Sequence, residues 1–263
     1  MPQVRIRDTQ LFYRWDGPEK GPVLLLSHAL GAHHGMWDAN VPALARGLRV
    51  LRYDHRGHGS SGVTAGPYTI ELLARDVLDL IDALALGTVS FCGLSMGGMV
   101  GMWLGANAGE RIERLILANT SAHLASPDAM NARIAAVTRS GMAAVADTMV
   151  ERWFTPRFRA EQPAAVARVR EMLLASPAQG YIASCLAVRD MDQRALLAKI
   201  RAPALVIGGL SDPATPPEHA RALRDQIAGA RLAELEAAHV SNIEAAAGFN
   251  QAVLAFLEET SDP

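Results

Sequence analysis

The sequence has 263 residues, half of them hydrophobic, and a formal net charge of −2. That length suits one α/β domain carrying a subdomain and is short for two full domains. Because acidic and basic residues are nearly balanced and interspersed, the charge favours neither nucleic acid nor an anionic membrane as a partner. The two cysteines, Cys92 and Cys185, form neither a metal-binding spacing nor a disulfide framework.

Targeting signals are also missing from the sequence pattern. Residues 1–15 contain no apolar segment of the kind that a signal peptide needs. No apolar run reaches the roughly 18 residues of a membrane-spanning helix. We therefore expect a soluble cytoplasmic protein.

Strand and helix patterns alternate over residues 1–121. Residues 4–7 and 10–15 alternate like a hairpin at the edge of a sheet. Apolar runs predict buried strands at 23–27, 49–53, 88–92 and 115–118. Helical spacing predicts helices at 37–46, with a break near Pro42, at 69–84 and at 96–107.

The alternation of strand and helix patterns stops near residue 121. Residues 122–195 show no convincing strand, and helices are predicted at 130–138, 141–154, 163–175 and 180–189. Alternation then resumes with a strand at 204–208, a helix at 217–227, a strand at 231–235 and a helix at 248–259. This order predicts a mostly parallel sheet with helices on both faces, formed by residues 1–121 and 196–263. Residues 122–195 are expected to form a helical cap subdomain over the carboxyl edge of the sheet, where ligands bind in such folds.

A Gly-x-Ser-x-Gly motif, Gly93 to Gly97, lies between a predicted strand and a predicted helix. That context is typical of a nucleophile elbow, in which a sharp turn presents the serine above the sheet. The turn leaves no room for side chains at either glycine. The plainer alternative is an ordinary serine, Ser95, in a glycine-rich turn.

A serine nucleophile needs a base, and the base needs a partner that sets its tautomer. In this architecture the order along the chain is serine, acid, histidine. Asp212 is the one acid in the loop after the strand at 204–208, and His239 follows the strand at 231–235. His219 competes with His239 but lies in a helical pattern, and we interpret it as a surface residue. The alternative is that the three are ordinary loop residues in the right order.

Two backbone N–H groups are predicted to stabilise the oxyanion that forms when a serine attacks a carbonyl. One belongs to Met96, directly after the nucleophile at a helix N-terminus. The other belongs to Leu30, in the small-residue loop after the strand at 23–27. The alternative for this loop is a plain connection between strand and helix.

Four further histidines have less specific interpretations. Residues 54–60 contain two of them without metal spacing, and we interpret this segment as a structural turn. His33 and His34 could line a pocket or face solvent.

Longer stretches of the sequence are similar to a known family. The order of the oxyanion loop, the serine elbow, the helical insert, Asp212 and His239 resembles the α/β-hydrolase superfamily. Within it, the chain resembles the 3-oxoadipate enol-lactonases of the β-ketoadipate pathway. This resemblance is carried by residues 50–59, 91–98, 151–158, 212–219 and 237–244.

The chain departs from that family at two places. His28 and Ala29 stand where members commonly carry Asn-Ser, and Met130 stands where many carry tryptophan. His plus a small residue is the wider superfamily's form of the oxyanion loop. The change at Met130 alters the expected packing around the substrate.

The resemblance implies hydrolysis of the 3-oxoadipate enol-lactone ring in aromatic-compound catabolism. The reaction would pass through an acyl-enzyme on Ser95 and would need no metal or organic cofactor. The substrate is a small anion, so a basic group must meet its carboxylate, and Arg133 is the first choice. Trp153 is expected to be a pocket wall. A solvated helix face is the alternative for Arg133.

Other functions use the same triad or the same fold. A general carboxylesterase, a perhydrolase and a hydrolase of carbon–carbon bonds would share Ser95, Asp212 and His239. A receptor that binds a small lactone with slight turnover belongs to another class. Assays on the enol-lactone, p-nitrophenyl esters and dienoate diketones would separate these possibilities.

Overall fold

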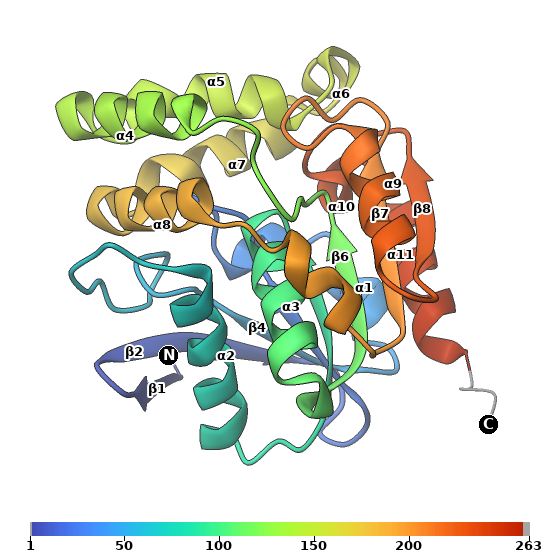
Figure 1. Ribbon diagram of the computed structural model, residues 1–263. Helices are drawn as coiled ribbons and strands as arrows, with labels where there is room; N and C mark the ends of the chain where they lie inside the picture. The colour runs from blue at the N-terminus through green and yellow to red at the C-terminus, as the bar shows by residue number, and fades with distance from the viewer. Residues whose placement is uncertain (1, 260–263) are drawn as a thin grey trace.

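The computed structural model describes residues 2–259, which form an eight-stranded sheet with helices on both faces (Figure 1). The strand order is β1-β2-β4-β3-β5-β6-β7-β8. Strands β1 and β2 pair antiparallel with their neighbours, and the rest of the sheet is parallel. The strands are β1 (Gln3–Ile6), β2 (Thr9–Asp16), β3 (Val23–Ser27), β4 (Arg49–Tyr53), β5 (Val89–Leu94), β6 (Ile112–Ala118), β7 (Ala204–Gly209) and β8 (Arg231–Leu235).

The predicted α/β class and mostly parallel sheet are confirmed. The central strands β5 and β7 are buried along their whole length, which is why their sequences are continuous apolar runs rather than alternating ones. Strand β5 runs two residues beyond the expected end and so includes Gly93 and Leu94. Strand β6 begins at Ile112, three residues before the expected start.

Helices α2 (Ile70–Ala83) and α3 (Met96–Asn107) pack together on one face of the sheet, and α1 (Val41–Leu44) packs with α11 (Ala246–Glu258) on the other (Figure 1). The hydroxyl of Thr69 caps α2 by accepting the N–H of Leu72 at 3.0 Å. Helix α3 is apolar nearly all round because it is buried between the sheet and its neighbours. None of the helices within residues 2–259 combines the length and apolar character needed to cross a bilayer.

The helix predicted over residues 37–46, with a break near Pro42, is only partly confirmed. The segment contains a short 3₁₀ turn, η1 (His34–Trp37), and then the four-residue helix α1. Proline lacks an N–H and is tolerated only in the first turn of a helix, so Pro42 begins a new helix instead of continuing one.

The insert contains five helices, one more than predicted. The short helix between Pro156 and Pro163 was missed because each proline starts a new helix. All five lie together beyond the carboxyl ends of the strands, above the arrowhead of β6 (Figure 1). The division into a core and a cap subdomain stays a prediction. The helices are α4 (Asp128–Ser140), α5 (Ala143–Trp153), α6 (Pro156–Glu161), α7 (Pro163–Ala175) and α8 (Ala178–Asp190).

The last part of the core follows the predicted order. Helix α9 (Pro217–Gln226) separates β7 from β8. A 3₁₀ helix, η3 (Arg194–Lys199), and a four-residue helix, α10 (Ser241–Glu244), were not predicted. Both are too short to show a helical period in the sequence.

Candidate active site

Ser95 sits on a strained turn between β5 and α3. Its φ of 56° and ψ of −114° place a non-glycine residue in a sparsely populated backbone region. A Cβ at Gly93 would lie 2.1 Å from the carbonyl oxygen of Gly97, and one at Gly97 would lie 2.2 Å from that of Ser27. Both positions therefore require glycine, as the sequence pattern predicted.

The structure brings Ser95, His239 and Asp212 into one hydrogen-bonded row. Nε2 of His239 lies 2.9 Å from Oγ of Ser95, and Nδ1 lies 2.8 Å from Oδ2 of Asp212. With its hydrogen on Nδ1, a neutral His239 donates to the carboxylate and directs the lone pair of Nε2 at the serine hydroxyl. This is the geometry that a general base needs.

The carboxylate of Asp212 is held by several donors besides His239. The N–H groups of Ala214 and Thr215 reach Oδ1 at 2.8 and 3.0 Å. The hydroxyl of Thr215 and the amide of Asn119 reach Oδ2 at 2.7 and 3.0 Å. Burial by itself would raise the pKa of Asp212, but the charge of His239 and the hydrogen bonds from His239 and Thr215 lower it to about 2. Asp212 is therefore ionised at neutral pH.

The segment that follows β6 contains no acidic residue, but it donates hydrogen bonds to Asp212 and to the backbone of Ser95. Asn119 donates to both Asp212 and the carbonyl of Ala238. Thr120 donates from Oγ1 to the carbonyl of Ser95 at 2.7 Å. No local signal in the sequence could have revealed these contacts.

The loop after β3 holds the peptide group between Ala29 and Leu30 in a fixed orientation. The carbonyl of Ala29 accepts from Nδ1 of His28 at 2.8 Å and from the N–H of Ala32 at 3.0 Å. In a trans peptide the N–H of the next residue points the opposite way, so the Leu30 N–H is directed away from these donors. Leu30 lines the same cavity as Ser95.

Three buried histidines form a layer behind this loop, which we call the histidine layer: His28, His55 and His58. Nε2 of His28 accepts the N–H of His55 at 2.9 Å, and Nε2 of His58 accepts the N–H of Gly31 at 3.0 Å. Burial lowers the pKa of all three, that of His58 to about 4, so the rings are neutral and able to accept. The structural interpretation of residues 54–60 fits this arrangement.

A cavity of about 260 Å³ opens above Ser95, between the sheet edge and the insert helices. Met130 and Arg133 reach it from α4, and Arg152 and Trp153 from α5. The Trp153 ring lies 6.1 Å, centroid to centroid, from the ring of His239. Arg133 and Trp153 therefore lie where the sequence analysis expected them, although their contact with a substrate stays a prediction.

The charged side chains that line the cavity are basic. Among the described residues that line it there is no aspartate or glutamate, while two arginines are present. Neither Arg133 nor Arg152 forms an ion pair within residues 2–259. Arg152 donates to the carbonyl of Pro213 at 2.9 Å, and sequence reasoning missed it because the insert contains many arginines.

His219 also lines this cavity, so its interpretation as a surface residue is wrong. It lies in the first turn of α9, and its Nδ1 contacts Oγ of Ser121 in the segment after β6. Helical spacing in the sequence shows which residues share a face but not what the face meets.

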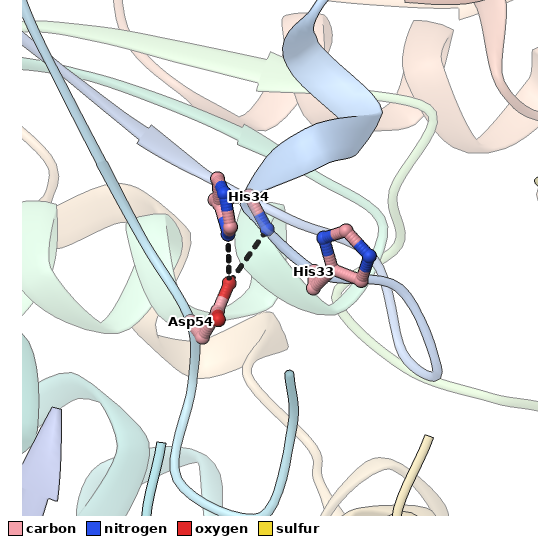
Figure 2. Close-up of side chains that lie close together, drawn as sticks. All are labelled: His33, His34 and Asp54. Atoms are coloured by element: carbon pink, nitrogen blue, oxygen red, sulfur yellow. Dashed lines mark hydrogen bonds and ion pairs between the residues drawn. The ribbon is translucent and has the colours of Figure 1, made fainter. Parts of the chain in front are cut away.

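His33 and His34 do not line the cavity above Ser95. Figure 2 shows them beside Asp54, and the three side chains together have potential metal-ligand atoms within 4.8 Å of one another. However, Oδ1 of Asp54 accepts from the backbone N–H and Nδ1 of His34, at 2.7 and 2.8 Å. Nδ1 of His33 accepts the N–H of Gly35 at 3.0 Å. Through these contacts Asp54 joins the segment after β4 to the loop that contains His33 and His34, so the cluster links two loops.

Comparisons with known proteins agree with this geometry. The family whose model matches is described as the alpha/beta hydrolase fold, and the match covers residues 22–246. The chain is 37% identical over 252 residues to 3-oxoadipate enol-lactonase 2 of Acinetobacter baylyi, covering 96% of this chain and 94% of that relative. The crystal structure of the enol-lactonase from Burkholderia xenovorans LB400 is 43% identical, with a TM-score of 0.96, and the match covers 98% of this chain and 100% of that one.

A second solved structure, of a hydrolase from Pseudomonas aeruginosa PA01, is 46% identical with a TM-score of 0.95 and 98% of each chain covered. The similarity thus extends over the insert as well as the core. The chain therefore belongs to the α/β-hydrolase family, and its predicted resemblance to the 3-oxoadipate enol-lactonases is confirmed.

Proposed function

We propose that this protein hydrolyses the ring of 3-oxoadipate enol-lactone to 3-oxoadipate. The observation that carries this proposal is the position of Ser95 and His239 at a small cavity lined by two arginines and by no acidic residue that the structure describes. Such a cavity suits a small anion that contains an ester bond. The names of the similar proteins from Acinetobacter and Burkholderia support the same substrate.

In the first half of the reaction, Oγ of Ser95 attacks the lactone carbonyl while Nε2 of His239 takes its proton. Asp212 remains ionised and stabilises the imidazolium that forms. The oxyanion lies between the N–H groups of Leu30 and Met96. Each such donor lowers the activation barrier by roughly 3–4 kcal/mol. Because the Ala29 carbonyl is already held by His28, the Leu30 donor needs no reorganisation when the charge develops.

Ring opening then breaks the bond between the acyl carbon and the ring oxygen. The leaving group is an enolate, whose conjugate acid is far more acidic than an alcohol, so it departs with little acid catalysis and takes the proton that His239 received from Ser95. A water molecule activated by His239 hydrolyses the acyl-enzyme on Ser95 and releases the product. Each step uses only side chains and backbone groups of this chain.

Arg133 is proposed to bind the carboxylate arm of the substrate, with Trp153 as the wall of the pocket. A guanidinium matches a carboxylate in shape and offers two parallel hydrogen bonds. Because Arg133 has no ion-pair partner among the described residues, it would not have to break one to bind the substrate. Residues 122–195 would then act as a cap that supplies specificity to a generic triad.

The decisive test is a kinetic assay on freshly generated enol-lactone, with Ser95→Ala as the matched control. We expect a kcat above about 1 s⁻¹, which is ordinary for an enzyme and too fast for a lactone receptor. Parallel assays use p-nitrophenyl esters and dienoate diketones. A higher kcat/KM for either of those than for the enol-lactone would replace the proposal with an esterase or a carbon–carbon bond hydrolase.

A further inference from the structure

A second histidine in the cavity is held in one tautomer by its neighbours. Nδ1 of His219 lies 2.6 Å from Oγ of Ser121. The hydroxyl of Ser121 donates its single hydrogen to the carbonyl of His123 at 2.6 Å and also accepts the N–H of His123 at 3.2 Å. A serine hydroxyl has one hydrogen, so Nδ1 of His219 must supply the hydrogen of the shared bond. A neutral His219 therefore keeps an unprotonated Nε2.

That ring is anchored close to the nucleophile. Ser121 directly follows Thr120, whose hydroxyl donates to the carbonyl of Ser95. His219, Ser95 and His239 all line the same cavity. Since Nδ1 is turned toward Ser121, Nε2 is the polar atom of His219 that remains for a bound molecule.

The proposed reaction leaves a proton transfer for which His239 is poorly suited. When the ring opens, His239 returns the serine proton to the departing ring oxygen and becomes neutral, as deacylation requires. The product fragment is then an enol, and the final product is a ketone. Ketonisation moves one proton from the enol oxygen to the neighbouring carbon, and His239 is engaged with Ser95 and the attacking water.

We propose that His219 is a second catalytic base, which ketonises the enol inside the cavity before release. Nε2 of His219 takes the proton from the enol oxygen, so that the O–H bond breaks and an N–H bond forms. The same proton then passes to the neighbouring carbon, where a C–H bond forms while the carbon–carbon double bond becomes single and the C–O bond becomes a carbonyl. His219 ends neutral, with no net gain or loss of protons or electrons. This inference rests on the proposed enol-lactone activity.

The experiment follows deuterium delivery in D₂O with enol-lactone as the probe. The wild-type protein is expected to place deuterium on one face of the carbon, because a fixed base delivers it. His219→Gln should release free enol, seen as an ultraviolet-absorbing transient, and should give a near-equal mixture of the two stereoisomers. Appearance of ketone should fall at least tenfold more than consumption of lactone, in line with the roughly 10²–10⁴-fold contribution of a positioned acid or base.

Glu218→Gln is the matched control, because it makes the same replacement at the exposed neighbouring position of α9. It should keep the stereochemistry of the wild type. His219→Asn serves as a second variant, and thermal unfolding shows whether each variant is folded. A wild-type product that carries deuterium equally on both faces would overturn the inference even if neither variant folds.

The outcomes also separate this inference from the proposed function. If wild-type protein consumes the lactone and His219→Gln keeps full stereoselectivity without free enol, only the role of His219 is lost. If wild-type protein leaves the lactone intact, the proposed function fails, and the role of His219 fails with it.

Discussion

The histidine layer and the cavity place the same side chain in opposite situations. In the layer, His28, His55 and His58 use both ring nitrogens in hydrogen bonds to fixed protein groups, and burial keeps the rings neutral. In the cavity, His239 and His219 use Nδ1 for positioning and keep Nε2 for the nucleophile or the substrate. Of these two groups, the histidines proposed to react keep Nε2 for the nucleophile or the substrate, and those of the histidine layer keep neither nitrogen.

The two cavity histidines differ in the partner of Nδ1. His239 faces the ionised carboxylate of Asp212, which in the proposed mechanism stabilises a full imidazolium while the acyl-enzyme forms. His219 faces the neutral hydroxyl of Ser121, which orients the ring without adding a negative charge. A charged partner suits a base that must hold a proton through a difficult step, and a neutral partner suits a brief proton shuttle.

The largest expected effect comes from removing the base in the cavity. His239→Gln should lower kcat on the enol-lactone by about 10⁶-fold, because Ser95 is not activated without it. The measurement is steady-state kinetics, with thermal unfolding to show that the fold is retained. A loss of less than about 100-fold would mean that another group activates Ser95.

The second largest effect tests whether His239 needs the negative charge of Asp212 or only its shape. Asp212→Asn keeps the size of the side chain but offers an amide hydrogen where the carboxylate accepted one, so His239 would turn to the wrong tautomer. We expect kcat to fall by roughly 10⁴-fold. Activity that stays near wild type would show that Asp212 orients His239 without the need for its charge.

Acid should lower the stability of the folded protein by protonating the histidine layer. The folded pKa of His58 is about 4, below its ordinary value of 6.5, so the unfolded chain binds a proton first as pH falls. The free energy of unfolding should therefore be highest above pH 6.5 and should fall by about 3 kcal/mol between pH 6.5 and pH 4 from His58 alone.

Urea denaturation at several pH values between 7 and 4 measures this loss. His28 and His55 shift in the same direction and add to it. The variant His58→Gln should be less stable at pH 7 and should show a shallower pH dependence. Equal slopes for the variant and the wild type would remove His58 as the cause.

The smallest effect concerns the insert side of the cavity. Arg133→Ala should raise KM for the charged lactone by about tenfold, equivalent to roughly 1.4 kcal/mol, and should spare an uncharged ester. Arg139→Ala is the matched control, because Arg139 lies on the same helix and is exposed away from the cavity. Equal changes for both substrates would assign Arg133 to the structure of the insert instead of to the carboxylate.

Local patterns predicted most of the sheet and the row of Ser95, Asp212 and His239. Strands β3, β4 and β8 and helices α3 and α7 have the expected bounds, since consecutive residues carry their periodicity. The glycines at 93 and 97 are likewise a local requirement of one tight turn. The break expected near Pro42 is present, but the helix expected over residues 37–46 is reduced to the short helix α1, because proline is accommodated only in the first turn of a helix.

The sequence by itself determined the fold class, the elbow and the order of the proposed catalytic residues, because each depends on neighbours in the chain. Only the tertiary structure decided which histidines keep a nitrogen for chemistry. Asn119 and Asp212 are 93 residues apart, and Ser121 and His219 are 98 residues apart. Contacts at such separations depend on how the strand ends meet at one edge of the sheet, and no local pattern records that meeting.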